Sequence, residues 1–279
     1  MSVRSSPKFR EVKLDSATLK DLMADVAAAV YDKSSVVLSK RQRKDKVSAT
    51  HIKRPTLPAR KTLTPAQQWR AHLWMIDTAH AQGEQALRGL AIALARMIQA
   101  DAFGVLFFDT RPGVTSRGNV DDLLWDRTCP VTNDGRSLHE LLKPRRERRQ
   151  YDLGTTALIA NVWEPWRMAR ALECLGPEGE WGEWRQDRHN HFATVWHPWP
   201  LVWVCNGNHS ATAAALKGGG SLQCEEAFDA TPLLDVVSTN GRQWFGEDGR
   251  VLGRVHSMPM AGIIEIGRRL VQLSKARRK

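Results

Sequence analysis

The spacing of apolar positions predicts two helices in the first half of the chain and a strand–turn–helix unit in the second. Residues 65–81 and 84–100 carry apolar side chains at helical spacing, with Gly83 between them. Residues 201–205 form a short apolar run, and the alanine-rich residues 211–216 strongly favour helix. The pattern therefore predicts a mixed α+β fold with a helical N-terminal region.

The remaining elements are shorter. We expect strands at 103–108, 151–160, 191–196 and 232–237, and helices at 16–31, 138–142, 168–175 and 261–274. Residues 33–62 are polar, basic and interrupted by proline, which is typical of a linker. The chain thus divides into a basic, partly helical arm at 1–62, a helical region with a short strand at 63–150, and a core with a basic C-terminal helix at 151–279.

The turn between the predicted strand and the alanine-rich helix is polar and reads Asn206, Gly207, Asn208, His209, Ser210. A helix that starts after such a turn presents backbone N–H groups that suit a phosphate. Ser210 is the expected N-cap, because a serine hydroxyl can accept from a first-turn N–H group. Asn-Gly is also an ordinary turn sequence, and a buried histidine is more often structural than chemical.

Charge is unevenly distributed. The net charge is +11, of which residues 1–61 carry +9 and residues 262–279 carry +5, so residues 62–261 carry −3. Basic termini attract polyanions with little sequence preference, and we expect nucleic acid to bind there, with a merely solvated tail as the alternative. A further basic cluster at 143–149 would strengthen the case for nucleic acid if it faced the same side as the turn.

The segment before the turn adds context. It holds Trp163, Glu164, Pro165 and Arg167, followed by a predicted helix, a predicted strand and then the Gly-x-His turn. This order resembles the ParB/sulfiredoxin superfamily, over about residues 155–225. The resemblance implies a small mixed sheet flanked by helices of the ParB/sulfiredoxin type.

The resemblance also implies a ligand. The superfamily includes CTP-using partition proteins, ATP-using reductases and nucleases, so it implies a site for a nucleoside triphosphate, ATP or CTP, together with Mg²⁺. That phosphate site would comprise Asn206, Gly207, Asn208, His209 and Ser210, with Arg167 as a second contact. Ser210 replaces the usual arginine and so removes a bidentate clamp. Asn208 stands where sulfiredoxin has its reactive cysteine, which argues against reductase chemistry.

The nearest analogy is to Osa-type plasmid fertility-inhibition proteins, for which ATPase and DNase activity is expected. It implies a role in control of plasmid DNA transfer, with a conjugation or secretion-apparatus protein as partner, or in defence. His209 would then be the general acid/base, and Glu164 or Asp187 would supply a carboxylate. The alternative is a non-catalytic DNA- or protein-binding module that keeps the fold without the chemistry.

Three further groups of side chains are candidates for a functional role. Cys205 fits a buried structural thiol better than a nucleophile. Of the eleven tryptophans, seven fall between 163 and 203; we favour a packing role over base stacking, with Trp181 and Trp184 as the candidates for exposed rings. His189 and His191, with Asp187 and Glu183, leave a metal site open.

The sequence also bears on location. The four cysteines lack metal-binding spacing, which indicates a reducing compartment. No apolar run reaches the length of a membrane helix, and the N-terminus has no hydrophobic signal core. We therefore expect a cytoplasmic protein, with peripheral association with a membrane left open.

Overall fold

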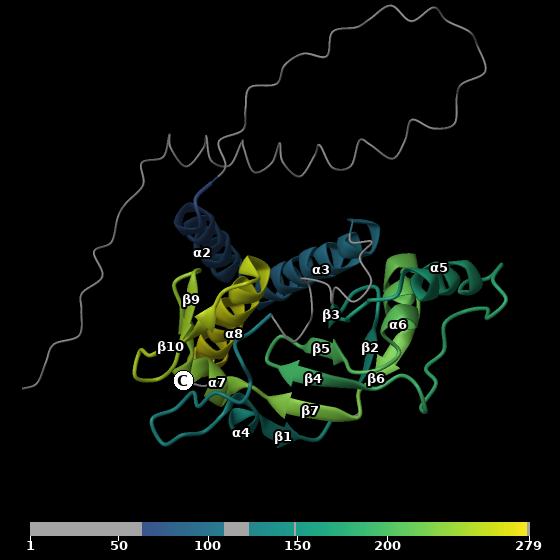
Figure 1. The fold of residues 1–279 in the computed structure, drawn as a ribbon. Coiled ribbons are helices and arrows are strands. Elements are labelled where there is room, and N and C mark those ends of the chain that lie inside the picture. Colours follow the sequence, from purple (N-terminus) through teal and green to yellow (C-terminus); the bar gives the residue numbers. More distant parts are fainter. Residues whose placement is uncertain (1–62, 109–122, 148, 278–279) are drawn as a thin grey trace, which may run out of the picture. The chain divides into compact units, whose positions relative to one another are not determined.

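The computed structural model describes residues 63–108, 123–147 and 149–277. The helix predicted at 16–31 and the linker at 33–62 lie outside these residues. The fold is α+β, as the pattern predicts, with helices before the main sheet (Figure 1). The helices are α2 (Pro65–Gln82), α3 (Glu84–Phe108), α4 (Leu138–Leu141), α5 (Pro165–Cys174), α6 (Asn208–Lys217), α7 (Thr231–Val236) and α8 (Met258–Ala276).

The main sheet is five-stranded and mixed. Its strands are β1 (Lys143–Arg145), β3 (Ala157–Ile159), β4 (Ala193–His197), β5 (Leu201–Val204) and β7 (Glu226–Asp229), in the order β1-β7-β4-β5-β3. β5 is parallel to β3 and antiparallel to β4, while β7 is parallel to β4 and antiparallel to β1. Two small sheets accompany it, one of β2 (Gln150–Asp152) and β6 (Ser221–Gln223), the other of β8 (Ser238–Thr239), β9 (Gln243–Phe245) and β10 (Val251–Arg254).

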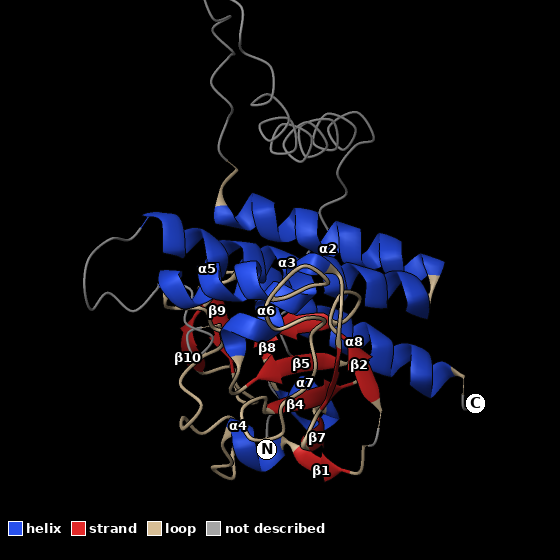
Figure 2. Ribbon diagram, turned by 90° about the vertical axis from the view of Figure 1, so that its right-hand side faces the viewer, coloured by secondary structure: helices blue, strands red, loops and turns tan. Residues whose placement is uncertain are grey.

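Successive residues of a strand point to opposite faces of the sheet, and in β3 and β5 both faces are buried. In β5, Leu201 and Trp203 join a core with α2, α3 and α8, whereas Val202 and Val204 join a second core with α5 and α6. Figure 2 shows the helices around the strands of the sheet. Burial on both faces explains why β5 reads as an unbroken apolar run.

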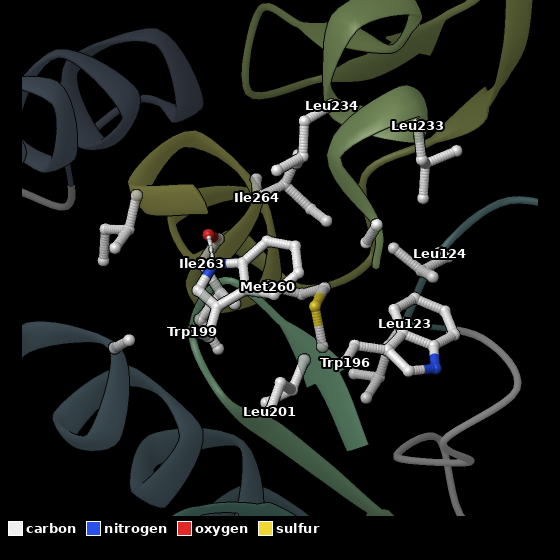
Figure 3. Packing of buried hydrophobic residues seen from close by; sticks show 14 of the residues in the cluster. Leu123, Leu124, Trp196, Trp199, Leu201, Leu233, Leu234, Met260, Ile263 and Ile264 are labelled. Carbon is white, nitrogen blue, oxygen red and sulfur yellow. Dashed lines mark hydrogen bonds between the residues drawn. The ribbon is translucent and has the colours of Figure 1, made fainter. Parts of the chain in front are cut away.

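Trp199 lies at the centre of the first core, between the sheet and α8. Its indole N–H donates to the backbone carbonyl of Ile263 (Figure 3). Gly267 makes this approach possible, since a Cβ there would lie 2.2 Å from Cζ2 of Trp199. The α8 helix can therefore pack closely against this large buried ring.

Two predicted strands are wrong. Residues 103–108 continue α3, and Phe103 and Leu106 pack three residues apart on the core beside α5 and α6. Residues 232–237 belong mostly to α7, where a proline occupies the first turn and two adjacent leucines are buried. A short apolar run is compatible with both the helical and the strand period. Here packing against neighbouring helices favours the helix. The region 151–160 holds the end of β2 and all of β3, separated by a turn.

The other long elements agree with the pattern. Thr64 and Gln67 form a capping box at the start of α2, and Gly83 separates α2 from α3. Helix α3 packs directly on β3, so the N-terminal helices and the sheet share one core. In the part of the chain that the structure describes, no helix has the length and apolar character needed to cross a membrane.

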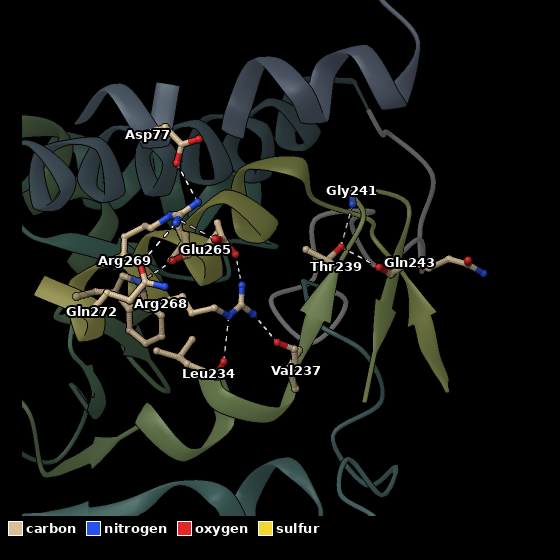
Figure 4. Close-up of polar contacts among 12 residues, drawn as sticks. Asp77, Leu234, Val237, Thr239, Gly241, Gln243, Glu265, Arg268, Arg269 and Gln272 are labelled. Atoms are coloured by element: carbon tan, nitrogen blue, oxygen red, sulfur yellow. Dashed lines mark hydrogen bonds and ion pairs between the residues drawn. The ribbon is translucent and has the colours of Figure 1, made fainter. Parts of the chain in front are cut away.

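The basic residues of the last helix are engaged within the fold. Arg268 donates to the carbonyls of Leu234 and Val237 at the end of α7 and pairs with Glu265 (Figure 4). The other described basic side chains of this segment also have acidic partners: Arg269 with Asp77, Lys275 with Asp235 and Arg277 with Glu84. These arginines and this lysine help to fasten α8 to its neighbours.

Candidate functional site

Two strand ends and two helix starts meet at one edge of the main sheet. β3 and β5 are parallel neighbours, so their carboxyl ends lie side by side. A loop from β3 leads into α5, and the turn after β5 leads into α6. Ligands of open α/β sheets bind outside the carboxyl ends of parallel strands, which makes this edge the place to look for a site.

Gly207 shapes the turn. Its φ of 76° is left-handed, and a Cβ at this position would lie 2.2 Å from Cδ2 of His191. Only glycine meets both conditions without strain. Gly207 is also the N-cap of α6, so the expectation that Ser210 is the N-cap is wrong. The helix begins earlier, at Asn208, and the Ser210 hydroxyl instead donates to the Gly207 carbonyl at 3.0 Å.

The turn is fastened to the loop before α5 by two hydrogen bonds. The Asn208 side-chain oxygen accepts from the backbone N–H of Asn161 at 2.8 Å. His209 Nε2 accepts from the backbone N–H of Glu164 at 3.2 Å. Asn208 and His209 are both buried. The structure thus brings together the two segments that the sequence singled out, with Glu164 next to His209.

These bonds define the state of His209. Because Nε2 accepts a hydrogen bond, the neutral ring carries its proton on Nδ1. Burial lowers the pKa of His209, the Arg167 charge lowers it further, and Glu164 opposes both. A lowered pKa favours the neutral ring, whose N–H group is then the one at Nδ1. In this tautomer it has no free lone pair with which to accept a proton.

Ser210 and His191 resemble a nucleophile–base pair, but their hydrogen bonds run in the wrong direction. His191 Nδ1 accepts from the Asp187 backbone N–H at 2.8 Å, so the neutral ring carries its proton on Nε2. Nε2 lies 2.6 Å from the Ser210 oxygen and must donate to it. The Ser210 proton then goes to the Gly207 carbonyl. Burial lowers the pKa of His191, which keeps this arrangement.

A cavity of about 590 Å³ opens at this edge. All six residues expected to bind phosphate line it: Arg167, Asn206, Gly207, Asn208, His209 and Ser210. The N-cap of α6 is Gly207, which has no side chain to cap the helix, and no described side chain accepts a hydrogen bond from the first-turn N–H groups. An anion bound at this helix start would therefore accept hydrogen bonds from the first-turn N–H groups.

The cavity is strongly basic. Arg167, Arg170 and Arg185 line it, and among the residues that the structure describes Glu183 is the one acidic side chain of the lining. Within the described residues none of these three arginines forms an ion pair. Our sequence-based site included Arg167 and missed Arg170 and Arg185. Arg170 could have been found from the sequence, because it follows Arg167 by three residues and so lies on the same face of the helix.

Three tryptophans around the cavity are exposed. Trp163, Trp166 and Trp181 keep 48%, 59% and 46% of their surface accessible. The prediction for Trp181 is confirmed, whereas Trp184 is only 7% exposed and the prediction for it is wrong. The Trp184 ring turns inward against His191 and Gly220, where it joins the second core. Most of the described tryptophans are buried, as expected, but these three are not.

Cys205 lies beside a second cavity of about 460 Å³. It is exposed, so the expectation of a buried thiol is wrong, because β5 ends one residue earlier and the chain turns outward. The protein atoms around the sulfur still raise its pKa, and the thiol donates towards the Trp203 carbonyl. A protonated thiol is a poor nucleophile.

The metal site left open at His189 and His191 is not formed. Residues 187–190 turn rather than extend, and both ring nitrogens of His191 are already engaged. Among the residues that the structure describes, no group of three or more histidine, cysteine or acidic side chains could hold a metal ion.

Arg148 lies outside the described residues, and the other residues of the basic cluster at 143–149 do not line the cavity at the α6 turn. Arg145, Glu147 and Arg149 border a different cavity of about 610 Å³. There Glu147 accepts hydrogen bonds from Tyr151 and His197. The condition under which this cluster would support binding at the turn is therefore not met.

Comparison with known proteins gives one result. No curated protein and no solved structure matches the chain. A family model described as a family of unknown function (DUF6710) matches residues 56–277. The match covers most of the chain, including all of the site described above. The protein belongs to this family, DUF6710.

Proposed function

We propose that the cavity at the carboxyl edge of β3 and β5 binds the phosphate and base of a nucleotide unit, and that it holds this ligand without hydrolysing it. One observation carries the proposal: three arginines that form no ion pair with the described residues, together with exposed tryptophans, converge on the start of a helix whose N-cap is a glycine. Guanidinium groups and helix N-terminal amides bind phosphate, and indole rings stack on bases.

The reactive side chains support binding rather than catalysis. Ser210 gives its proton to a carbonyl, and His209 presents an N–H rather than a lone pair. Cys205 holds its proton. Catalysis by any of them would need the hydrogen bonds to be rearranged, whereas anion binding uses them as they stand.

The resemblance to the ParB/sulfiredoxin superfamily also supports the proposal. The elements occur in the order that it implies, with Pro165 opening α5, then β4, β5, the turn and α6. The serine at position 210 offers a hydroxyl where the family's arginine would clamp a phosphate. By analogy with the Osa-type proteins, we place this binding function in the control of plasmid DNA transfer.

Binding can be measured by titrating the protein with ATP, CTP, dTMP and inorganic phosphate, with and without Mg²⁺, using tryptophan fluorescence and calorimetry. Arg167→Ala should weaken binding by about 10- to 150-fold, because it removes a charge-assisted hydrogen bond. Arg254→Ala, which removes an exposed arginine of β10 outside the cavity, is the matched control and should bind as the wild type does. Equal affinities of the Arg167 variant and the wild type would contradict the proposal.

Hydrolysis is tested separately. ATP turnover and cleavage of plasmid DNA with Mg²⁺ should both stay at background for the wild type. Turnover that is present in the wild type and absent in His209→Ala would overturn the binding-only proposal and restore His209 as a general acid/base.

A further inference from the structure

Three exposed tryptophans gather at the cavity, and each ring contacts a polar or charged side chain. We call Trp163, Trp166 and Trp181 the tryptophan ledge. The Trp166 indole N–H donates to the Glu164 carboxylate, and the Trp163 and His209 rings form a T-shaped pair with centroids 4.7 Å apart. A ring fixed before binding loses little conformational freedom when a base stacks on it.

Two members of the ledge are paired with arginines of α5. The Arg167 guanidinium lies 5.3 Å from the centre of the Trp166 ring, and the Arg170 guanidinium lies 5.9 Å from that of Trp181. Arg167 and Arg170 are three residues apart on one face of the helix, or about 4.5 Å along its axis. The helix therefore presents two aromatic–cation units in succession, which a ligand with one base and one phosphate would not fill.

The charge of the cavity also suits a ligand of more than one nucleotide. Three arginines and one glutamate line the cavity, and the Glu164 carboxylate lies beside Trp166, so these side chains together carry a net charge of about +1. A nucleic-acid strand carries one negative charge for each nucleotide, whereas a free triphosphate concentrates several on one group. Positive charge spread over Arg167, Arg170 and Arg185 suits successive phosphodiesters. The exposed indole faces need bases that are not already paired and stacked in a duplex.

We propose that the tryptophan ledge and these arginines bind single-stranded nucleic acid across at least two nucleotides. Bases stack on Trp166 and Trp181, and the phosphates face Arg167 and Arg170. The inference rests on the proposed function and names its ligand. Stacking and phosphate contacts are tolerant of sequence, so the binding has little base preference.

The test uses the full chain and fluorescein-labelled oligothymidylates of two, four and eight nucleotides at fixed salt, with dTMP and an eight-base-pair duplex as comparison ligands. Affinity should rise from dTMP to the dinucleotide and onward, and the single strand should bind more tightly than the duplex. Trp166→Ala and Trp181→Ala should each lower single-strand affinity by about 5- to 150-fold, and Trp166→Phe should retain most of it. Phe192→Ala, which removes an exposed ring outside the cavity, is the control.

The outcomes separate the two proposals. If dTMP or ATP binds through Arg167 but longer strands bind no better and both tryptophan variants behave as the wild type does, single-strand binding is refuted and nucleotide binding stands. Equal binding of duplex and single strand, unchanged in the tryptophan variants, would assign the affinity to other basic segments and refute the inference. Absence of binding by every probe would refute both.

Discussion

The side-chain oxygen of Asn208 accepts a hydrogen bond from the backbone N–H of Asn161 at 2.8 Å, and so joins the ends of two parallel strands. Asn208 is only 5% exposed, and it stands in the first turn of α6. This contact helps to fix the distance between the loop that ends at Glu164, just before Arg167 in α5, and the turn that carries His209. The geometry of the cavity depends on it.

Asn208→Ala should destabilise the protein by about 1–3 kcal/mol, because the Asn161 N–H loses its acceptor in a buried place. Nucleotide binding should weaken as well, since only the bond between Glu164 and His209 then ties the two walls of the cavity. Urea unfolding and ligand titration measure the two effects. Asn133→Ala is the matched control, because Asn133 is exposed and lies outside the cavity. A similar loss in both variants would show that the Asn208 contact has no special weight.

Gly207→Ala should be more damaging than a typical glycine substitution. The left-handed backbone costs an alanine about 1–2 kcal/mol, and the new Cβ would also displace the His191 ring. The displaced ring can no longer hold Ser210, so ligand affinity should fall together with the unfolding free energy. Gly249→Ala offers a comparison, because its φ of 79° is similar and nothing lies within 4 Å of the added Cβ. Equal losses in the two variants would mean that only the backbone conformation matters.

Acid should destabilise the fold through three histidines. Burial is the largest cause that lowers the pKa of His191, His197 and His209 below the ordinary 6.5, so all three are neutral in the folded state. The unfolded chain takes up protons at ordinary pKa values. The stabilisation is therefore fully present above about pH 6.5 and is lost as the pH falls below that value.

Urea unfolding at several pH values between about 5 and 8 measures this loss. His189→Ala, which removes an exposed histidine, should keep the same dependence on pH, whereas His191→Asn should reduce it. An unfolding free energy that stays constant or rises on acidification would contradict the assignment of neutral buried histidines.

Arg268→Ala should lower stability by about 2–3 kcal/mol without changing ligand affinity. The substitution leaves the carbonyls of Leu234 and Val237 without their charged donor at the end of α7. Ligand affinity should not change, because neither Arg268 nor its partners Leu234, Val237 and Glu265 line the cavity. The Arg254→Ala variant again serves as control and should unfold as the wild type does. Loss of binding at temperatures where the variant remains folded would reveal a connection between α8 and the site.

Several elements were determined by the sequence alone. The helices α2 and α3 and the break at Gly83 follow from long apolar periodicity, which leaves little ambiguity over so many residues. The strand–turn–helix unit around Gly207 was also predictable, because an alanine-rich segment after a short apolar run has few alternatives. The strand prediction for residues 103–108 was wrong, since a short apolar run is compatible with both the helical and the strand period.

The composition of the cavity was decided by tertiary structure. Pairing of β3 with β5 placed residues 161–167 against the turn, and no local pattern encodes that pairing. Exposure was likewise decided by packing: Trp184 turns into the core while Trp163, Trp166 and Trp181 stay in solvent. The direction of proton donation through His191 and Ser210 depends on which backbone groups lie near them. The sequence supplies the side chains, but long-range packing sets their partners, and the partners determine whether a side chain binds or reacts.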